Sequence, residues 1–300
     1  MNMRPIDRRD FGRALAGAAA GTALSSFAAV ESPTNDTPLK FSVMLWTVDK
    51  KLPFERRMEM VAEAGYSAVE LVDEFKGWSD ADFRRVNARN RELKLTFDAT
   101  AGVWKGIADP GGIDAFVADL TAFVPTAQKL ECSDIIVLSG NRVEGATHEQ
   151  QHQACVESLK RGADIAEKNG LRLLLENIDQ EENPKYFLTS VAEGFGIVRE
   201  VNHPRVKFLY DFYHEQISEG NLIKKLEENI HQVGLVHIAD VPGRHEPGTG
   251  EIAYASIYRK LAQLHYSDYV AMEFEPTGNV VETLRKARTD AIDAAIKSIF

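Results

Sequence analysis

The chain of 300 residues carries 35 Lys and Arg against 45 Asp and Glu, a formal net charge of −10, and 44% of its residues are hydrophobic. That apolar share is enough for a buried core and excludes a globally disordered chain. The acidic balance argues against a nucleic-acid binder, which needs a basic face to meet phosphates, and two cysteines are too few for a disulfide framework or a four-cysteine zinc site.

The first 28 residues have the layout of an export signal. Arg8 and Arg9, with Phe11 two residues later, precede an Ala- and Gly-rich stretch that ends in small residues, which is typical of a twin-arginine signal peptide. We predict residues 1–28 as this signal and 29–38 as a polar linker, with an uncleaved tail as the alternative. The prediction implies the twin-arginine export machinery as a partner and a periplasmic or exported protein. Removal of the signal leaves 31 basic and 43 acidic residues, a net charge of −12.

Residues 39–300 alternate short β-rich runs with longer helical patterns, which predicts a single domain. Strands are expected at 41–47, 68–72, 95–99, 134–139, 172–177, 206–212, 234–239 and 269–274, and helices at 53–64, 79–93, 112–129, 147–169, 190–201, 219–230, 255–264 and 279–297. Eight βα units of about 30 residues predict a (β/α)8 TIM barrel. An open doubly wound sheet should show a glycine-rich phosphate turn after an early strand, and the sequence has none. No run in this part reaches the ~20 apolar residues of a membrane span.

Four consecutive predicted strands end in a residue that can ligate a metal. Glu176, Asp211, His237 and Glu273 each follow an apolar run at a strand's carboxyl end, where the active sites of barrels lie. Converging carboxylates that are removed from water demand either large pKa shifts or a cation. Three carboxylates and one imidazole suit Mn²⁺ or Mg²⁺ best, with Co²⁺ or Zn²⁺ as further choices. We therefore predict one divalent metal site, and separate ion-paired rim residues are the alternative.

The segments around these four residues resemble the hydroxypyruvate isomerase family, which belongs to the xylose isomerase-like TIM barrels. They are LLENID at 174–179, YDFYHEQ at 210–216 with GNL at 220–222, HIADVPGRHEP at 237–247 with GEIAY at 250–254, and YVAMEFEP at 269–276. The resemblance is strongest over residues 170–276 and weaker over 39–170. The export signal is an addition to the family pattern.

This resemblance implies a metal-dependent isomerase that interconverts hydroxypyruvate and 2-hydroxy-3-oxopropanoate through an enediolate, without a redox cofactor. Glu176 and Glu273 would be metal ligands and also the acid/base pair on opposite sides of the substrate. Members that act on hydroxypyruvate can carry Gln where this chain has His237, and His is commoner there among the epimerases. The alternatives are therefore a ketose or keto-inositol 3-epimerase, or a related dehydratase, and then a non-catalytic periplasmic sugar-binding protein.

Three further residues are candidates for binding the small keto acid or ketose substrate. His214 would hydrogen-bond a substrate oxygen, and Arg244, in a loop bounded by Pro and Gly, would clamp a carboxylate through two hydrogen bonds. The similar epimerases suggest that Glu182 holds a substrate hydroxyl, and Glu246 is a candidate brace for Arg244. The alternatives are a rim histidine for His214 and a solvated loop cation for Arg244.

Trp46 and Trp104 follow the first and third predicted strands, as pocket walls or as ordinary packing aromatics. Cys132 and Cys155 would pair only in an oxidising compartment, and buried free thiols are the favoured interpretation. A homo-oligomer is left open.

Overall fold

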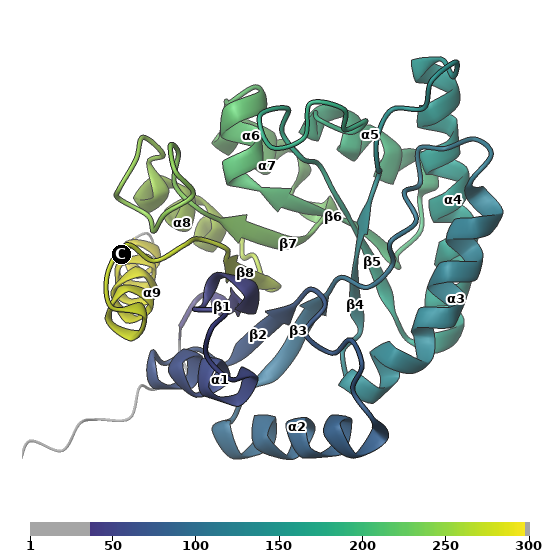
Figure 1. Ribbon diagram of the computed structural model, residues 1–300. Helices are drawn as coiled ribbons and strands as arrows, with labels where there is room; N and C mark the ends of the chain where they lie inside the picture. Colours follow the sequence, from purple (N-terminus) through teal and green to yellow (C-terminus); the bar gives the residue numbers. More distant parts are fainter. Residues whose placement is uncertain (1–36, 298–300) are drawn as a thin grey trace, which may run out of the picture. The chain divides into compact units, whose positions relative to one another are not determined.

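Eight parallel strands follow one another in residues 37–297, the part of the chain that the computed structural model describes. The predicted signal peptide and most of the linker lie outside the described residues. The strands are β1 (Lys40–Met44), β2 (Ala68–Leu71), β3 (Thr96–Thr100), β4 (Asp134–Leu138), β5 (Arg172–Glu176), β6 (Val206–Asp211), β7 (Val233–Ile238) and β8 (Tyr269–Met272). They pair in chain order, and β8 also pairs with β1, which closes the barrel (Figure 1). The predicted TIM barrel is confirmed.

Helices connect the strands and lie on the outside of the barrel (Figure 1). They are α1 (Phe54–Glu63), α2 (Asp80–Leu93), α3 (Ile113–Leu130), α4 (His148–Asn169), α5 (Val191–Val201), α6 (Phe212–Ser218), α7 (Leu222–Asn229), α8 (Tyr254–Gln263) and α9 (Val280–Ile296), with single 3₁₀ turns at Leu45–Thr47 and Ile230–Gln232. None of the helices within residues 37–297 has the length and apolar character to cross a membrane.

One helix was not expected from the sequence. α6 begins directly after β6 because the Asp211 side chain accepts hydrogen bonds from the backbone N–H groups of Tyr213 and His214, which is an N-cap. The predicted helix at 219–230 is shorter, at 222–229, because the chain turns at Gly220 and Asn221, both with positive φ. The first strand ends before Leu45, where a 3₁₀ turn begins.

The apolar residues form two layers on either side of the strands. The large outer cluster lies between the strands and the helices, and a small inner cluster fills the barrel: Met44, Ala99, Ile136, Leu174, Leu209, Leu235 and Ala271. Parallel strands that are buried on both faces require such continuous apolar runs. The polar residues in this interior are therefore exceptions that need a partner or a function.

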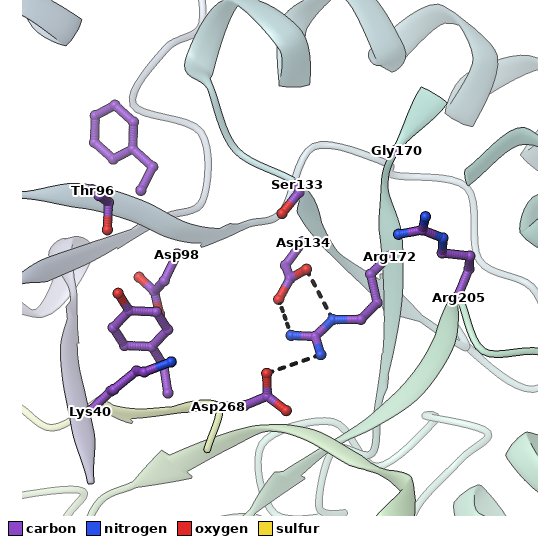
Figure 2. A pocket seen from close by; sticks show the side chains of 11 residues that line it. Lys40, Thr96, Asp98, Ser133, Asp134, Gly170, Arg172, Arg205 and Asp268 are labelled. Atoms are coloured by element: carbon purple, nitrogen blue, oxygen red, sulfur yellow. Dashed lines mark hydrogen bonds and ion pairs between the residues drawn. The ribbon is translucent and has the colours of Figure 1, made fainter. Parts of the chain in front are cut away.

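An ion-pair network closes the amino-terminal end of the barrel. Arg172 Nε and Nη1 lie 3.0 Å from oxygens of Asp134 and Asp268, respectively. Figure 2 shows these groups around a pocket of about 410 Å³, with the carboxylate of the buried Asp98 beside it; the lining is completed by Lys40, Thr96, Phe97, Ser133, Gly170, Arg205 and Tyr269. This pocket lies at the opposite strand ends from the four predicted ligands, because Asp134 and Arg172 are the first residues of β4 and β5.

Candidate metal centre at the carboxyl end of the barrel

The four predicted ligands converge at the carboxyl ends of β5 to β8. Glu176 and Asp211 are the last residues of β5 and β6, His237 lies in β7, and Glu273 directly follows β8. Strand register aligns them, since Asp211 pairs with His237 and the Glu273 N–H donates to the carbonyl of Ile238 at 3.0 Å. One ligand atom from each of the four lies within 4.8 Å of all the others, and all four residues are buried.

The donor atoms of this cluster face one another without satisfying one another. His237 Nδ1 lies 2.8 Å from Glu273 Oε2, 3.5 Å from Glu176 Oε1 and 3.9 Å from Asp211 Oδ2. Yet His237 Nδ1, Asp211 Oδ2 and Glu273 Oε2 are buried atoms without a hydrogen-bond partner. Buried polar atoms in native proteins nearly always have partners. Three such atoms so close together fit a divalent cation, whose identity these donors leave open.

Charges around the cluster shift the pKa values of its members in different directions. Burial raises the pKa of Glu176 above its usual value, against the opposing effect of His237. Burial also acts on Glu273, but the positive charges of Arg244 and His237 outweigh it and hold the pKa of Glu273 well below its usual range. Burial favours the neutral ring of His237, and the charges of Glu70 and Glu273 outweigh it, so the pKa of His237 is raised. The carboxylates of the cluster therefore favour a positive charge among them.

Arg244 lies beside the cluster and is held on several sides. Its Nη2 is 2.8 Å from Glu273 Oε2, and its Nη1 pairs with the carboxylate of Glu182. The guanidinium carbon lies 4.9 Å from the ring centre of Tyr213 and 5.6 Å from that of Trp46, which are distances for cation–π attraction. The structure thus brings two predicted substrate-binding residues, Arg244 and Glu182, to the predicted metal ligands.

The loop after β7 owes its shape to the buried side chain of Asp240. Its two carboxylate oxygens accept hydrogen bonds at 2.8–3.0 Å from four backbone N–H groups, those of Val241, Gly248, Gly250 and Ile252. The N–H of Arg244 donates to the Asp240 carbonyl at 3.1 Å, and Arg244 has a φ of 56°. One carboxylate therefore fixes the backbone from which Arg244 projects.

The expected brace for Arg244 was wrong. The Glu246 carboxylate accepts hydrogen bonds from the backbone N–H and the hydroxyl of Thr277 instead, at 3.0 and 2.5 Å. Glu182 and Glu273 take the place beside Arg244 that Glu246 was expected to fill.

His214 lies under the cluster with both ring nitrogens directed at carboxylates. Nδ1 donates to Asp179 Oδ2 at 2.6 Å, and Nε2 lies 3.4 Å from Asp211 Oδ2. Burial lowers the pKa of His214, but the charge of Asp211 and the hydrogen bond to Asp179 outweigh it and raise this pKa to about 9. Asp179 also accepts from the backbone N–H of Glu182 at 2.9 Å, so one carboxylate links the loop of Glu182 to His214.

Sequence reasoning missed Glu70, which lies in β2 on the far side of the His237 imidazole from the other three donors. Its two carboxylate oxygens are 3.0 and 3.2 Å from His237 Nε2, and its side chain is fully buried. The signal that revealed the four ligands was present here as well, since an acid interrupts the short apolar run Ala68–Leu71. Glu70 was overlooked although it lies one residue before the end of β2, the same place that His237 takes in β7.

Of the two tryptophans that the sequence suggested as pocket walls, Trp46 belongs to the site. Its indole Nε1 donates to Glu273 Oε1 at 3.2 Å, and a pocket of about 510 Å³ opens beside it, lined also by Lys50, Arg57, Val72, Asp73 and Glu74. Trp104 is exposed, and the ammonium group of Lys76 lies over its ring. The two cysteines are free and buried, as favoured, and burial raises the pKa of both thiols.

Comparison with known proteins assigns this chain to a family. The family model described as "Xylose isomerase-like TIM barrel" matches residues 58–297. Hydroxypyruvate isomerase of Escherichia coli is 30% identical, over 82% of this chain and 97% of that protein. A relative from Danio rerio, named after the same activity, is 33% identical over 83% and 95%. A 2-oxo-tetronate isomerase of Haemophilus influenzae is 30% identical over 82% and 96%.

Solved structures share the fold. A structure titled AP endonuclease, family 2, from Brucella melitensis has a TM-score of 0.75 at 27% identity, over 82% of this chain and 96% of that one. The IOLI protein, solved with a zinc atom, has a TM-score of 0.73 at 19% identity, over 87% and 99%. A D-psicose 3-epimerase of Clostridium cellulolyticum has a TM-score of 0.70 at 21% identity, over 87% and 98%.

The family match and the isomerase relatives agree, and each covers most of the barrel. The chain is thus an enzyme of the intramolecular oxidoreductase class. It belongs to the hydroxypyruvate isomerase family of the xylose isomerase-like TIM barrels.

Proposed function

We propose that this enzyme interconverts hydroxypyruvate and 2-hydroxy-3-oxopropanoate through an enediolate, with one divalent cation held by Glu176, Asp211, His237 and Glu273. The observation that carries the proposal is the set of buried ligand atoms that make no hydrogen bond and lie close together beside Arg244. The three sequence relatives named for isomerisation of oxo acids support the substrate class. Mn²⁺ or Mg²⁺ is the expected cation because oxygen donors predominate, and Co²⁺ or Zn²⁺ could replace it.

The reaction moves one hydrogen between neighbouring carbons. Either Glu176 or Glu273 takes the proton from the carbon that bears the terminal hydroxyl, and the other delivers a proton to the former ketone carbon. The hydroxyl proton moves to the former ketone oxygen, so no atom is gained or lost and no redox cofactor is needed. A divalent cation at the site supplies Lewis acidity, which acidifies the C–H group next to the carbonyl. General acid–base groups of this kind contribute about 10²–10⁴-fold to rates.

Arg244 gives the site its preference for an oxo acid. It is a permanent cation beside the donors, and its fork of N–H groups matches a carboxylate. Glu182 pairs with this guanidinium and is also the candidate for holding a substrate hydroxyl. His214, fixed by Asp179, is the remaining donor for a substrate oxygen.

The test is proton exchange. The full chain is incubated in D2O with hydroxypyruvate, a four-carbon 2-oxo acid such as 2-oxo-tetronate, and a panel of ketoses, with Mn²⁺ or with EDTA. We expect Mn²⁺-dependent exchange and isomerisation of a 2-oxo acid, and loss of turnover in Glu176→Gln and Glu273→Gln with circular dichroism unchanged. Metal-dependent exchange confined to C3 of ketoses would establish the epimerase instead, and no exchange with any compound would refute both. Retained ligand binding without turnover in the wild type would identify a sugar-binding protein.

We also propose that the chain is exported through the twin-arginine route to the periplasm. The Arg8–Arg9 pair and the apolar stretch after it support this, in residues that lie outside the described ones. Fractionation of cells that express the chain checks it: Arg8→Lys with Arg9→Lys should retain the protein inside. Equal export of this double variant would contradict the proposal.

A further inference from the structure

The carboxylate of Glu70 has one polar partner in the described chain, and that partner is His237. Both Glu70 oxygens lie within 3.2 Å of His237 Nε2, and the side chains of the two residues are 0% and 1% exposed, respectively. Burial of a carboxylate in a barrel interior is costly. Within residues 37–297, the Glu70 carboxylate accepts no hydrogen bond from a helix terminus, a loop N–H group or an arginine. The imidazole of His237 alone therefore offsets the cost of burying this carboxylate.

This contact decides which nitrogen of His237 can face the cation. A carboxylate is an acceptor, so Nε2 must carry a hydrogen and donate to Glu70. The ring then presents Nδ1 to Glu176, Asp211 and Glu273; Nδ1 lies 2.8 Å from Glu273 Oε2 but makes no hydrogen bond with it. A neutral imidazole ligates through its unprotonated nitrogen. With the hydrogen held on Nε2, that nitrogen is Nδ1.

We propose that Glu70 is the positioning residue of the metal centre: it fixes the tautomer and the ring plane of His237 and so raises the affinity of the site for its divalent cation. The inference rests on the proposed function, because it assumes that His237 is a ligand. Carboxylates in this relation to a ligating histidine strengthen cation binding by about 10–100-fold. Glu70 comes from β2, across the barrel from the four strands that supply the donors, so it also ties the amino-terminal half of the barrel to the site.

The experiment is titration of Mn²⁺ into the full chain, followed by calorimetry, for the wild type, Glu70→Gln and Glu70→Leu. Gln keeps an acceptor for the Nε2 hydrogen and loses the charge, whereas Leu loses both. We expect the dissociation constant for Mn²⁺ to rise about 10–100-fold in Glu70→Leu and less in Glu70→Gln. In the diamagnetic Mg²⁺ form, ring ¹⁵N NMR should show His237 protonated at Nε2 in the wild type and a mixed or altered tautomer in Glu70→Leu.

Glu215→Gln is the matched control. Glu215 is also fully buried and paired with a single type of cationic group, the ammonium of Lys225, and it does not touch the cluster. It should change stability without changing Mn²⁺ affinity or the His237 tautomer. If Glu70→Leu does not fold in the presence of EDTA, Glu70→Gln decides alone.

Wild-type affinity in both Glu70 variants, or a loss no larger than that of Glu215→Gln, would overturn the inference, as would a His237 that binds through Nε2. The proposed function fails separately: a wild type that binds Mn²⁺ without isomerising any oxo acid leaves the affinity series valid. A wild type that binds no divalent cation would overturn both.

Discussion

At the residue scale, the chemistry depends on which charges are permanent. Arg244 cannot lose its proton, lies within hydrogen-bond distance of Glu273, and has the rings of Trp46 and Tyr213 nearby. Its stacking and its fork of donors are properties that lysine lacks. A ligand carboxylate held by such a fork gains more than one held by a single ammonium.

Arg244→Lys should therefore raise KM for a 2-oxo acid about 10–100-fold, the equivalent of one lost charge-assisted hydrogen bond of about 1.5–3 kcal/mol. The effect on neutral ketoses should be small, and steady-state kinetics on both substrate types measure the difference. Arg199→Lys, on the exposed face of α5, is the control and should behave as wild type. Equal losses for oxo acids and ketoses would show that Arg244 does not bind the substrate carboxylate.

Asp98 differs from Arg244, because its carboxyl group can titrate and has no hydrogen-bond partner in the described chain. It is 9% exposed, and neither of its carboxylate oxygens has a hydrogen-bond partner. Burial, together with the charge of Glu70, raises the pKa of Asp98 well above its usual value, despite the nearby hydroxyl of Ser42. The folded state then binds a proton that the unfolded state has released, so this residue's contribution to stability is full below the unfolded pKa and is lost as pH rises.

Asp98→Asn removes that pH dependence. We expect the variant's Tm to exceed that of the wild type by more at pH 8 than at pH 5, measured by thermal unfolding in EDTA. Asp164→Asn, exposed on α4, should show the same small difference at both pH values. A Tm difference for Asp98→Asn that does not grow with pH would mean that this carboxyl group is solvated or paired in solution.

At the scale of elements, the loop between β7 and α8 depends on a single side chain. Four backbone N–H groups donate to Asp240, and the same loop carries Arg244. Loops of this length without regular structure are held by such internal hydrogen bonds. The four hydrogen bonds to Asp240 therefore hold the backbone of this loop in place.

Asp240→Asn should disturb both stability and catalysis. One oxygen becomes an amide N–H₂ group and leaves the N–H groups of Gly248 and Gly250 without an acceptor, which costs about 1–3 kcal/mol. kcat/KM for an oxo acid should fall as Arg244 loses its place. Thr147→Ala, which removes the N-cap of α4, should cost about 1 kcal/mol without a change in kcat/KM. If the two variants lose activity equally, the loop has no specific role.

Much of this architecture was predictable from the sequence because the strands of a barrel are apolar runs that can be recognised in the sequence. All eight strands and the four converging donors followed from that signal. α6 did not, because Asp211 was interpreted as a ligand alone, and the structure shows that it is a helix N-cap. The pairing of Glu70 with His237 and that of Arg244 with Glu182 join residues far apart in the chain, so the local pattern around Glu70 does not reveal its partner.

At the scale of the whole molecule, a bound cation should stabilise the barrel by joining four of its strands. A ligand that binds the folded state alone adds about 2.7 kcal/mol at a free concentration of 100 times its dissociation constant. Mn²⁺ should thus raise Tm and EDTA should reverse the rise, as scanning calorimetry would measure. His237→Ala should abolish the Mn²⁺ effect, and an undiminished rise in that variant would place the cation elsewhere.

The order of the strands also determines when the cluster can exist. Its donors come from the last four strands, and Glu273 follows β8, which pairs with both β7 and β1. The amino-terminal strands leave the ribosome first, so the scaffold is synthesised before the final donor. A nascent chain that stops short of β8 has an open sheet edge and only three of the four donors. Cation uptake would then report that translation has reached the last strand and that the ring is closed.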